Sequence, residues 1–221
     1  MNEKVKMTWQ GKIVAVQPRI RLTRSYDERQ HTYLGYVLGI HGTLGSQPES
    51  SFLVAIGPKA HEEHKAQVGD HVAGASAPVA DPELETAGYY KTSELQILAH
   101  AQSSGPGEKG PPFHALAPSL ETYRAKGHRR LDARTYAAKC TTCVWGCKMP
   151  VEIIIDHWNR SRASDNVKRR FETFCYGPKD CSAYSAGPVR KVQGRKKWMV
   201  HEDDGDSTGQ HSGDTVGQQW E

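Results

Sequence analysis

Five cysteines within forty-two residues constrain this chain more than any other feature of its sequence. The remaining 179 residues of the 221-residue chain contain no cysteine, and the spacing is C-x2-C-x3-C followed by C-x5-C. Thiolates in closely spaced groups are how a chain builds a soft-ligand metal site. The sequence therefore predicts a metal-binding module that contains Cys140, Cys143, Cys147, Cys175 and Cys181.

Disulfide bonding is the alternative, because clustered cysteines also stabilise small secreted domains. The number of cysteines is odd, and the first three are too close together to pair comfortably. The N-terminal segment MNEKVKMTWQ has no apolar stretch of the signal-peptide type. We therefore expect reduced thiols in a cytoplasmic protein. No stretch approaches the roughly 18 to 20 apolar residues of a transmembrane helix, so we also expect a soluble chain.

Four thiols suffice for a tetrahedral Zn²⁺ site, and the two pairs resemble those of zinc ribbons and knuckles. The expected ligands are Cys140, Cys143, Cys175 and Cys181, with Cys147 as an alternative to Cys143. Gly146 and the Gly177-Pro178 turn would let the backbone fold around the sulfurs. The C-x5-C pair is wider than the C-x2-C of an ordinary zinc ribbon, and one thiol is left over. A [4Fe-4S] cluster is therefore the alternative cofactor.

The first hundred residues read as short strands separated by turns. Alternating apolar positions predict strands over 11–24, 32–40 and 52–56, and Pro18 is expected to bend the first of them. Pro58 opens an expected polar helix over 59–67, which Gly69 ends. Two further strands are expected, one from residue 69 onward and one over 89–98. The predicted order is three strands, a short helix and two strands.

That order, with its long bent first strand, resembles the OB-fold, a five-stranded Greek-key barrel, over about residues 8–99. The resemblance implies binding of single-stranded nucleic acid or oligosaccharide across the second and third strands. Side chains available on the corresponding face are Arg19, Arg21, Arg24, Tyr33 and Tyr36. The alternative for either tyrosine is a place in the barrel core, because the faces of a strand cannot be assigned without its register.

Composition divides the rest of the chain. Residues 101–119 are rich in Gly, Pro and Ser, which is typical of a flexible linker. A helix is expected to start at Ser119 and run towards Arg130, although Gly127 disfavours it, and a strand is expected over 151–155. We therefore predict a mainly β protein: an OB-like barrel (1–100), the linker (101–119), a Cys-rich α+β metal-binding module (120–200) and an acidic disordered tail (201–221).

Charge is concentrated in the cysteine-bearing part. Residues 120–200 carry 18 Lys and Arg against 7 Asp and Glu, whereas residues 1–119 carry 11 against 12 and residues 201–221 carry 0 against 6. Basic residues interleaved with aromatic ones are typical of nucleic-acid binding. An ordinary solvated face is the alternative. Candidate phosphate contacts here are Lys168, Arg169, Arg170, Arg190, Lys191, Arg195, Lys196 and Lys197.

The sequence contains no Walker loop, G-x-S-x-G elbow or dinucleotide fingerprint. Glu152, Asp156 and Glu172 are candidates for acid–base chemistry beside a metal, and His157 for a further ligand or catalytic group, although a structural role for this histidine is preferred. A site closed by four cysteines has no open position for water. We therefore favour a binding protein for RNA or single-stranded DNA, and leave catalytic activity open.

Two other hypotheses remain from the sequence. The first is a [4Fe-4S] protein with an enzymatic or electron-transfer role. The second is a scaffold that joins a protein partner through the barrel. The histidines His61 and His64 have the i, i+3 spacing of a helix face but no evident third ligand, so we expect them on the surface.

Overall fold

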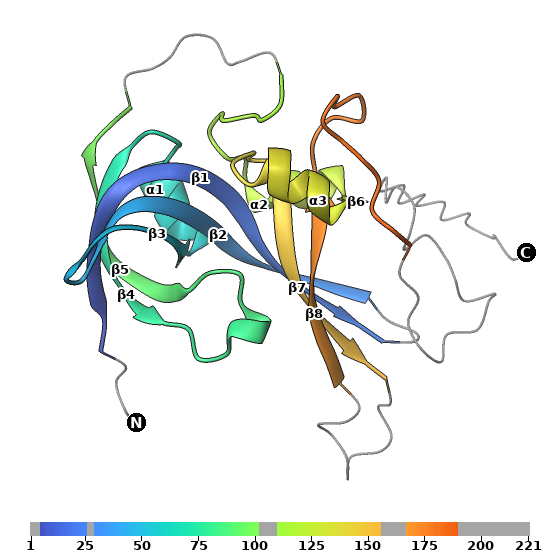
Figure 1. Cartoon of the computed structure of the whole chain (residues 1–221), viewed down its shortest axis with the longest axis horizontal. Coiled ribbons are helices and arrows are strands. Elements are labelled where there is room, and N and C mark those ends of the chain that lie inside the picture. The colour runs from blue at the N-terminus through green and yellow to red at the C-terminus, as the bar shows by residue number, and fades with distance from the viewer. Residues whose placement is uncertain (1–4, 26–28, 102–109, 156–166, 190–221) are drawn as a thin grey trace, which may run out of the picture.

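The structure of the chain is a computed structural model that describes residues 5–25, 29–101, 110–155 and 167–189. It is mainly β, with short helices on either side of an extended sheet (Figure 1). Among the helices of these ranges, none is both long and apolar enough to cross a membrane. The expected acidic tail (201–221) lies outside the described residues.

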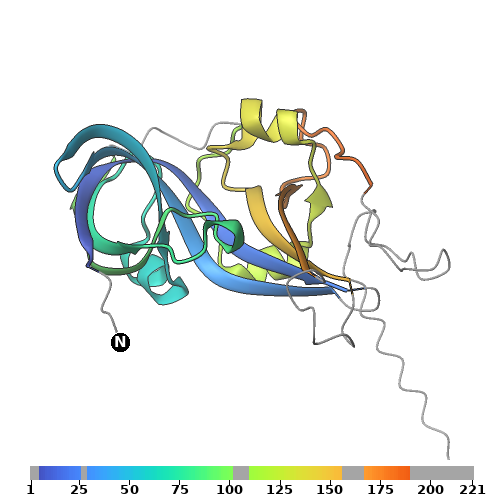
Figure 2. The same ribbon diagram turned by 60° about the horizontal axis from the view of Figure 1, so that its bottom comes forward.

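The first part of the chain forms a ring of five strands, which is seen almost end-on in Figure 2. β1 pairs with β2 along one edge and with β4 along the other, and β5 joins β4 to β3. The expected five strands and the helix between the third and fourth are confirmed. Their bounds are β1 (Met7–Arg24), β2 (Arg29–Leu44), β3 (Gln47–Ile56), α1 (Pro58–His64), β4 (His71–Pro78), η1 (Pro82–Leu84) and β5 (Tyr89–Ala99).

Strand β1 is long because it pairs with strands in both parts of the molecule. Its pairing with β2 shifts register between Ile13 and Ala15 and again between Arg19 and Ile20, next to Pro18. Opposite Arg19, Gly35 has a φ of 132°, and a Cβ there would lie 2.2 Å from the carbonyl oxygen of Ile56. Only glycine fits this position, so the irregular pairing is built into the sequence. The irregularities let β1 leave the ring and continue outward.

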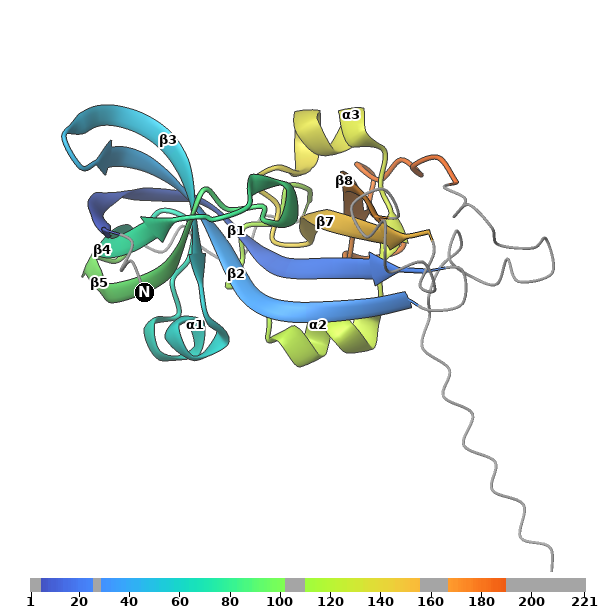
Figure 3. The ribbon, with the colours of Figure 1, turned by 90° about the horizontal axis from the view of Figure 1, so that it is seen from below.

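Beyond the ring, the end of β1 pairs in parallel with β7 (Gly146–Ile154), from Leu22 opposite Val151 to Arg24 opposite Ile153. β7 forms an antiparallel hairpin with β8 (Val167–Cys175), which also pairs with the two-residue strand β6 (Arg129–Arg130). The ring and the cysteine-bearing part thus share one eight-stranded sheet, in the order β2-β3-β5-β4-β1-β7-β8-β6. Figure 3 shows β1 and β2 running out of the ring beside β7 and β8.

Short helices flank this extension of the sheet on opposite sides (Figure 3). α2 (Leu120–Lys126) starts after Ser119, whose hydroxyl accepts from the backbone N–H of Thr122, and it ends at Gly127 with a φ of 68°. α3 (Ala133–Thr135) lies on the other side and continues into the π-helical turn η2 (Tyr136–Cys140). The expected helix therefore forms, but it ends at Lys126, before Gly127, and does not reach Arg130, which belongs to β6.

Residues 110–119 of the expected linker are packed between the two parts. The carbonyl of Phe113 accepts from the backbone N–H of Val144 at 2.9 Å, and the carbonyl of Pro118 accepts from the hydroxyl of Tyr36 at 2.7 Å. Ala117 is buried in a hydrophobic cluster that also contains residues of the ring and of β7 and β8. Residues 110–119, which were expected to be a flexible boundary, therefore pack against both parts. Residues 102–109 lie outside the described part of the chain.

Candidate functional site

Four of the five cysteines come together at one end of the β7–β8 hairpin. Cys140 ends η2, Cys143 follows in the next turn, Cys175 ends β8, and Cys181 lies in the turn after it. Burial, together with the nearby thiols of Cys143, Cys175 and Cys181, raises the pKa of the Cys140 thiol to about 11. Within the described ranges, no group of three or more His, Cys, Asp or Glu side chains is already arranged to hold a metal ion.

Backbone groups surround the first cysteine pair. The N–H of Cys143 donates to the carbonyl of Cys140 at 3.2 Å, and the N–H of Gly146 donates to the carbonyl of Cys143 at 3.0 Å. Burial raises the pKa of the Cys143 thiol, and backbone hydrogen bonds from Trp145, Phe113 and Gly146 oppose this. A Cβ on Gly146 would lie 2.5 Å from the carbonyl oxygen of Cys140, so the turn requires glycine.

The second pair has the same kind of support. The N–H of Gly177 donates to Cys175 Sγ at 3.3 Å, and the N–H of Cys181 donates to the carbonyl of Pro178 at 3.3 Å. Hydrogen bonds to sulfur favour the thiolate, which is the form that binds metal. The Gly177-Pro178 turn thus links Cys175 to Cys181 and supplies one N–H to the first of these sulfurs.

Gln17 of β1 holds the turn between Cys140 and Cys143 from outside. Its Nε2 donates to the carbonyl of Cys140 at 2.8 Å and to that of Cys143 at 3.0 Å, and its Oε1 accepts from the hydroxyl of Tyr136 at 2.7 Å. The side chain is buried, and these bonds use both ends of its amide. A lone glutamine in a strand gives no sequence signal of this role, so the sequence analysis did not find it.

Cys147 belongs to a different hydrophobic cluster from Cys140, Cys143 and Cys175. Its side chain is fully buried in β7, and its thiol donates to the carbonyl of Pro18 at 3.3 Å. Burial alone raises the pKa of this thiol far above its usual value. Cys147 therefore behaves as a neutral core side chain that joins β7 to β1, and this accounts for the cysteine that the sequence left over.

Within the described part of the chain, most arginines expected to contact nucleic acid are paired with other groups of the protein. Arg24 is 1% exposed, and together with Arg130 and Arg170 it surrounds the buried carboxylate of Glu172, at nitrogen–oxygen distances of 3.5, 2.7 and 2.6 Å. Burial raises the pKa of Glu172, but the three guanidiniums outweigh this and hold the pKa below its usual value. Glu172 is thus a structural anion, and its carboxylate is not available for the acid–base role considered from the sequence.

Other arginines that were expected to contact nucleic acid also have partners within the protein. Arg19 is paired with the buried Glu85, and Arg21 donates to the carbonyl of Leu84 at 2.9 Å. Arg169 contacts Asp81 at 3.2 Å and the second acid–base candidate, Glu152, at 3.4 Å. Lys168 is exposed on β8. The remaining candidates Arg190, Lys191, Arg195, Lys196, Lys197, Asp156 and His157 lie outside the described residues.

Tyr33, Tyr36 and His61 line a cleft between α1 and α2. Tyr36 is buried, and its ring lies over that of His61, with 3.8 Å between ring centroids. The surface position expected for His61 is wrong: it is 6% exposed because its Nε2 bonds to the carbonyl oxygen of Ala117 at 3.0 Å. Tyr33 is partly buried at the edge of the cleft, whose volume is about 620 Å³.

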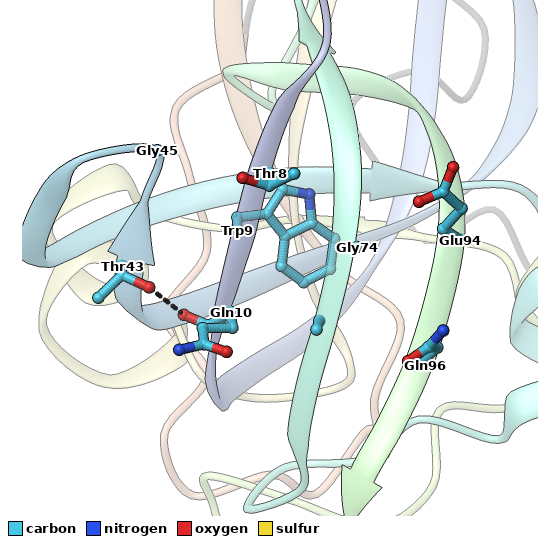
Figure 4. Close-up of a pocket in the computed structure, with 9 residues that line it drawn as sticks. Thr8, Trp9, Gln10, Thr43, Gly45, Gly74, Glu94 and Gln96 are labelled. Atoms are coloured by element: carbon cyan, nitrogen blue, oxygen red, sulfur yellow. Dashed lines mark hydrogen bonds between the residues drawn. The ribbon is translucent and has the colours of Figure 1, made fainter.

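A second hollow lies at the start of β1, over the edge of the ring (Figure 4). Its volume is about 340 Å³, and polar side chains such as Gln10, Glu94 and Gln96 line it around Trp9. Trp9 is only 3% exposed, and its indole N–H donates to Ser76 Oγ at 2.8 Å. A Cβ on Gly74 would lie 2.7 Å from the indole ring, so this tryptophan is a packed core residue.

Three cations lie over aromatic rings around α2 and the cysteine turns. Arg124 lies 4.8 Å from the ring centroid of Tyr33, Lys126 lies 5.1 Å from that of Trp145, and Arg129 lies 4.1 Å from that of Tyr184. We call these three pairs the cation–π row. The interleaving of basic and aromatic residues was the signal for them, but the individual pairs depend on tertiary contacts.

Contacts connect the second and third pairs of the cation–π row through the turn after β8. A Cβ on Gly177 would lie 3.2 Å from Cβ of Trp145, and the carbonyl of Pro178, the next residue, accepts from Arg129 at 2.6 Å. The turn that carries Cys175 therefore lies between the second and third pairs of the row.

Comparison with known proteins gives no relative for this arrangement. No family model, curated protein or solved structure matches the chain.

Proposed function

We propose that this protein binds single-stranded nucleic acid, RNA or DNA, along the cation–π row. The observation that carries the proposal is the row itself: one cation–aromatic pair joins β2 to α2, and the other two involve aromatic rings close in sequence to Cys143 and Cys181. Aromatic rings offer stacking surfaces to bases of any sequence, and neighbouring cations neutralise the phosphates between them. The interface differs from the one expected on β1, where Arg19 and Arg24 are paired with carboxylates. Arg129 of the row donates to backbone carbonyls, which do not neutralise its charge.

The arrangement of the ring supports this proposal. Its strand order, β1-β2-β3-β5-β4 closing on β1, with α1 between β3 and β4, is the order of an OB barrel. OB barrels present single-stranded ligands to the face formed by their second and third strands. Tyr33, the first aromatic of the row, comes from β2. On this proposal the bound strand runs from the edge of the ring onto the cysteine-bearing part.

We further propose that Cys140, Cys143, Cys175 and Cys181 hold one structural Zn²⁺ ion. The convergence of the four thiols and the backbone hydrogen bonds to Cys143 and Cys175 support it. The ion would draw together two turns that flank the third pair of the row. A [4Fe-4S] cluster was suggested by a surplus thiol, and Cys147 now has a separate structural role. Elemental analysis and an ultraviolet–visible spectrum of anaerobically purified protein distinguish zinc from iron and sulfide.

Fluorescence anisotropy with labelled single-stranded RNA and DNA, measured at several salt concentrations, tests the binding function. The wild-type protein is expected to bind both, more weakly as salt rises. Lys126→Ala should weaken binding and reduce the magnitude of the logarithmic salt slope by about 0.7, the value for one phosphate contact on a single strand. The same substitution at Lys12, an exposed lysine of β1 in the ring, serves as the matched control.

Two results would contradict the proposal. One is the absence of binding at low salt by protein that contains its metal. The other is an equal loss of affinity in Lys126→Ala and Lys12→Ala, because this would indicate only a response to net charge.

A further inference from the structure

The cleft between α1 and α2 lies beside the first pair of the cation–π row and shares two residues with it. Tyr33 and Arg124 line the cleft as well as forming that pair. Its volume of about 620 Å³ is in the usual range for a small-ligand site. A strand bound along the row would therefore pass the opening of a cleft that already exists.

The floor of the cleft is aromatic, neutral and held in place. His61 Nε2 lies 3.0 Å from the carbonyl oxygen of Ala117, so this nitrogen carries the hydrogen. Burial lowers the pKa of His61, which keeps the ring uncharged at neutral pH. The hydroxyl of Tyr36 is fixed by Pro118, and burial raises its pKa to about 12. The floor offers flat, apolar surface and no charge that a polar ligand would have to neutralise.

The opening of the cleft combines apolar and charged groups. Leu116 is 44% exposed at its edge, and Lys65 and Arg124 supply cations on the α1 and α2 sides. The guanidinium of Arg124 rests on Tyr33 and is exposed, so a planar group has a surface on which to stack. The carboxylates of Glu62 and Glu121 also line the cleft, where they can accept hydrogen bonds from exocyclic amino groups but would repel phosphate.

We propose that this cleft receives one unstacked base of the nucleic acid bound along the cation–π row. The base stacks against the plane of Arg124 and enters over Leu116 towards the His61 ring, while its phosphate stays outside, near Lys65. Unstacked bases are commonly held between aromatic rings and arginine planes in single-strand complexes. This inference rests on the proposed function, and it adds the position at which a base, rather than the phosphate backbone, is bound.

Affinity measurements on three variants test the cleft. Arg124→Lys keeps the charge but removes the planar group, so binding should weaken by about tenfold with the salt slope unchanged, which matches the loss of one stacked base. Leu116→Glu places a carboxylate at the opening and should also weaken binding. Its control is Leu98→Glu, because Leu98 is an equally exposed leucine of β5 at 54% exposure. Circular dichroism spectra establish that each variant is folded.

Photocrosslinking gives a readout of position. A complex of the wild-type protein with an oligonucleotide that contains 5-iodouracil is irradiated, and mass spectrometry should find crosslinks to Tyr33 or His61. The Leu116→Glu substitution should abolish these crosslinks. If the wild type binds no oligonucleotide, the proposed function itself fails. If it binds, but Arg124→Lys and Leu116→Glu retain wild-type affinity and the crosslinks map elsewhere, the cleft is not a base site and only this inference is overturned.

Discussion

The ring and the cysteine-bearing part are stabilised in different ways, although they share one sheet. The ring encloses an apolar core of aliphatic side chains such as Ile13, Leu38, Ile40 and Val54, all of them fully buried. Much of the interior of the other part is polar or sulfur-containing: four thiols, the Gln17 amide, and the Glu172 carboxylate with its arginines. Hydrophobic burial tolerates small changes, whereas buried polar groups are costly once one partner is lost. The two parts should therefore respond differently to the same kind of perturbation.

Loss of the proposed metal should produce the largest difference in local stability between the two parts. Cys175→Ser is expected to lose the ion and to expose the amides of β6, β7 and β8 to hydrogen exchange, because structural zinc contributes on the order of 10 kcal/mol to folding of such modules. The amides of β2, β3 and β4 should remain protected. Hydrogen-exchange mass spectrometry of the full chain measures both regions at once.

Cys147→Ser is the matched control for that experiment. It also replaces a buried cysteine, but it keeps a donor for the carbonyl of Pro18 and leaves the four clustered thiols in place. Metal content should be unchanged. Equal loss of metal in the two variants would contradict the assignment of the four ligands.

Removing the charge of Glu172 should have the next largest effect. Glu172→Gln leaves three guanidiniums without their carboxylate, and breaking a buried ion pair costs roughly 3–5 kcal/mol. The control is Glu152→Gln, which loses only the exposed Arg169 pair and should cost less than about 1 kcal/mol. Urea unfolding gives the free energies. A Glu172→Gln protein as stable as the control would show that the arginines do not depend on this anion.

The Gln17 contacts test whether the ring positions the cysteine turn. Gln17→Leu removes the donor to two turn carbonyls, and loss of such supporting contacts typically lowers metal affinity about 10- to 100-fold. Competition with a chromophoric chelator measures Zn²⁺ affinity, and the absorption spectrum of Co²⁺-substituted protein reports the geometry of the thiolates. Gln10→Leu, on the same strand, should leave both unchanged. If Gln17→Leu and Gln10→Leu have the same Zn²⁺ affinity and the same Co²⁺ spectrum, Gln17 contributes only to packing.

A smaller effect is expected from pH. Burial, with the cations around it, lowers the pKa of His128 to about 2, while an unfolded histidine titrates near 6.5. The unfolded state therefore binds a proton that the folded state does not, and stability falls as pH drops below 6.5, by at most about 1.4 kcal/mol per pH unit. His128→Phe should flatten this slope between pH 6.5 and 5, whereas substitution of the exposed His41 by asparagine should not. Urea unfolding at each pH measures the free energy of unfolding. An unchanged slope in His128→Phe would contradict the assignment of this pH dependence to His128.

The ring could be predicted from the sequence because its signals are local. Alternation at Ile13–Leu22, the proline at residue 58 and the turn at Gly69 each specify a strand or helix from neighbouring residues alone. The parallel pairing of Leu22–Arg24 with Val151–Ile153 has no such signal, because it joins strands more than a hundred residues apart. Partners of arginines are also invisible in sequence, so Arg24 was expected on a binding face although it is buried. The grouping of the cysteines was predictable from spacing, but the role of Cys147 depended on Pro18.

The length of β1 has a practical consequence for dissecting the molecule. A fragment that begins after residue 101 lacks Leu22–Arg24 and Gln17, which leaves the edge of β7 unpaired and the cysteine turn without its amide contacts. Exposed strand edges of this kind recruit other chains and cause aggregation. The two halves should therefore be obtained by cutting the intact protein between 101 and 110, or by expressing both fragments together. We expect them to behave as a complementing pair rather than as two independent domains.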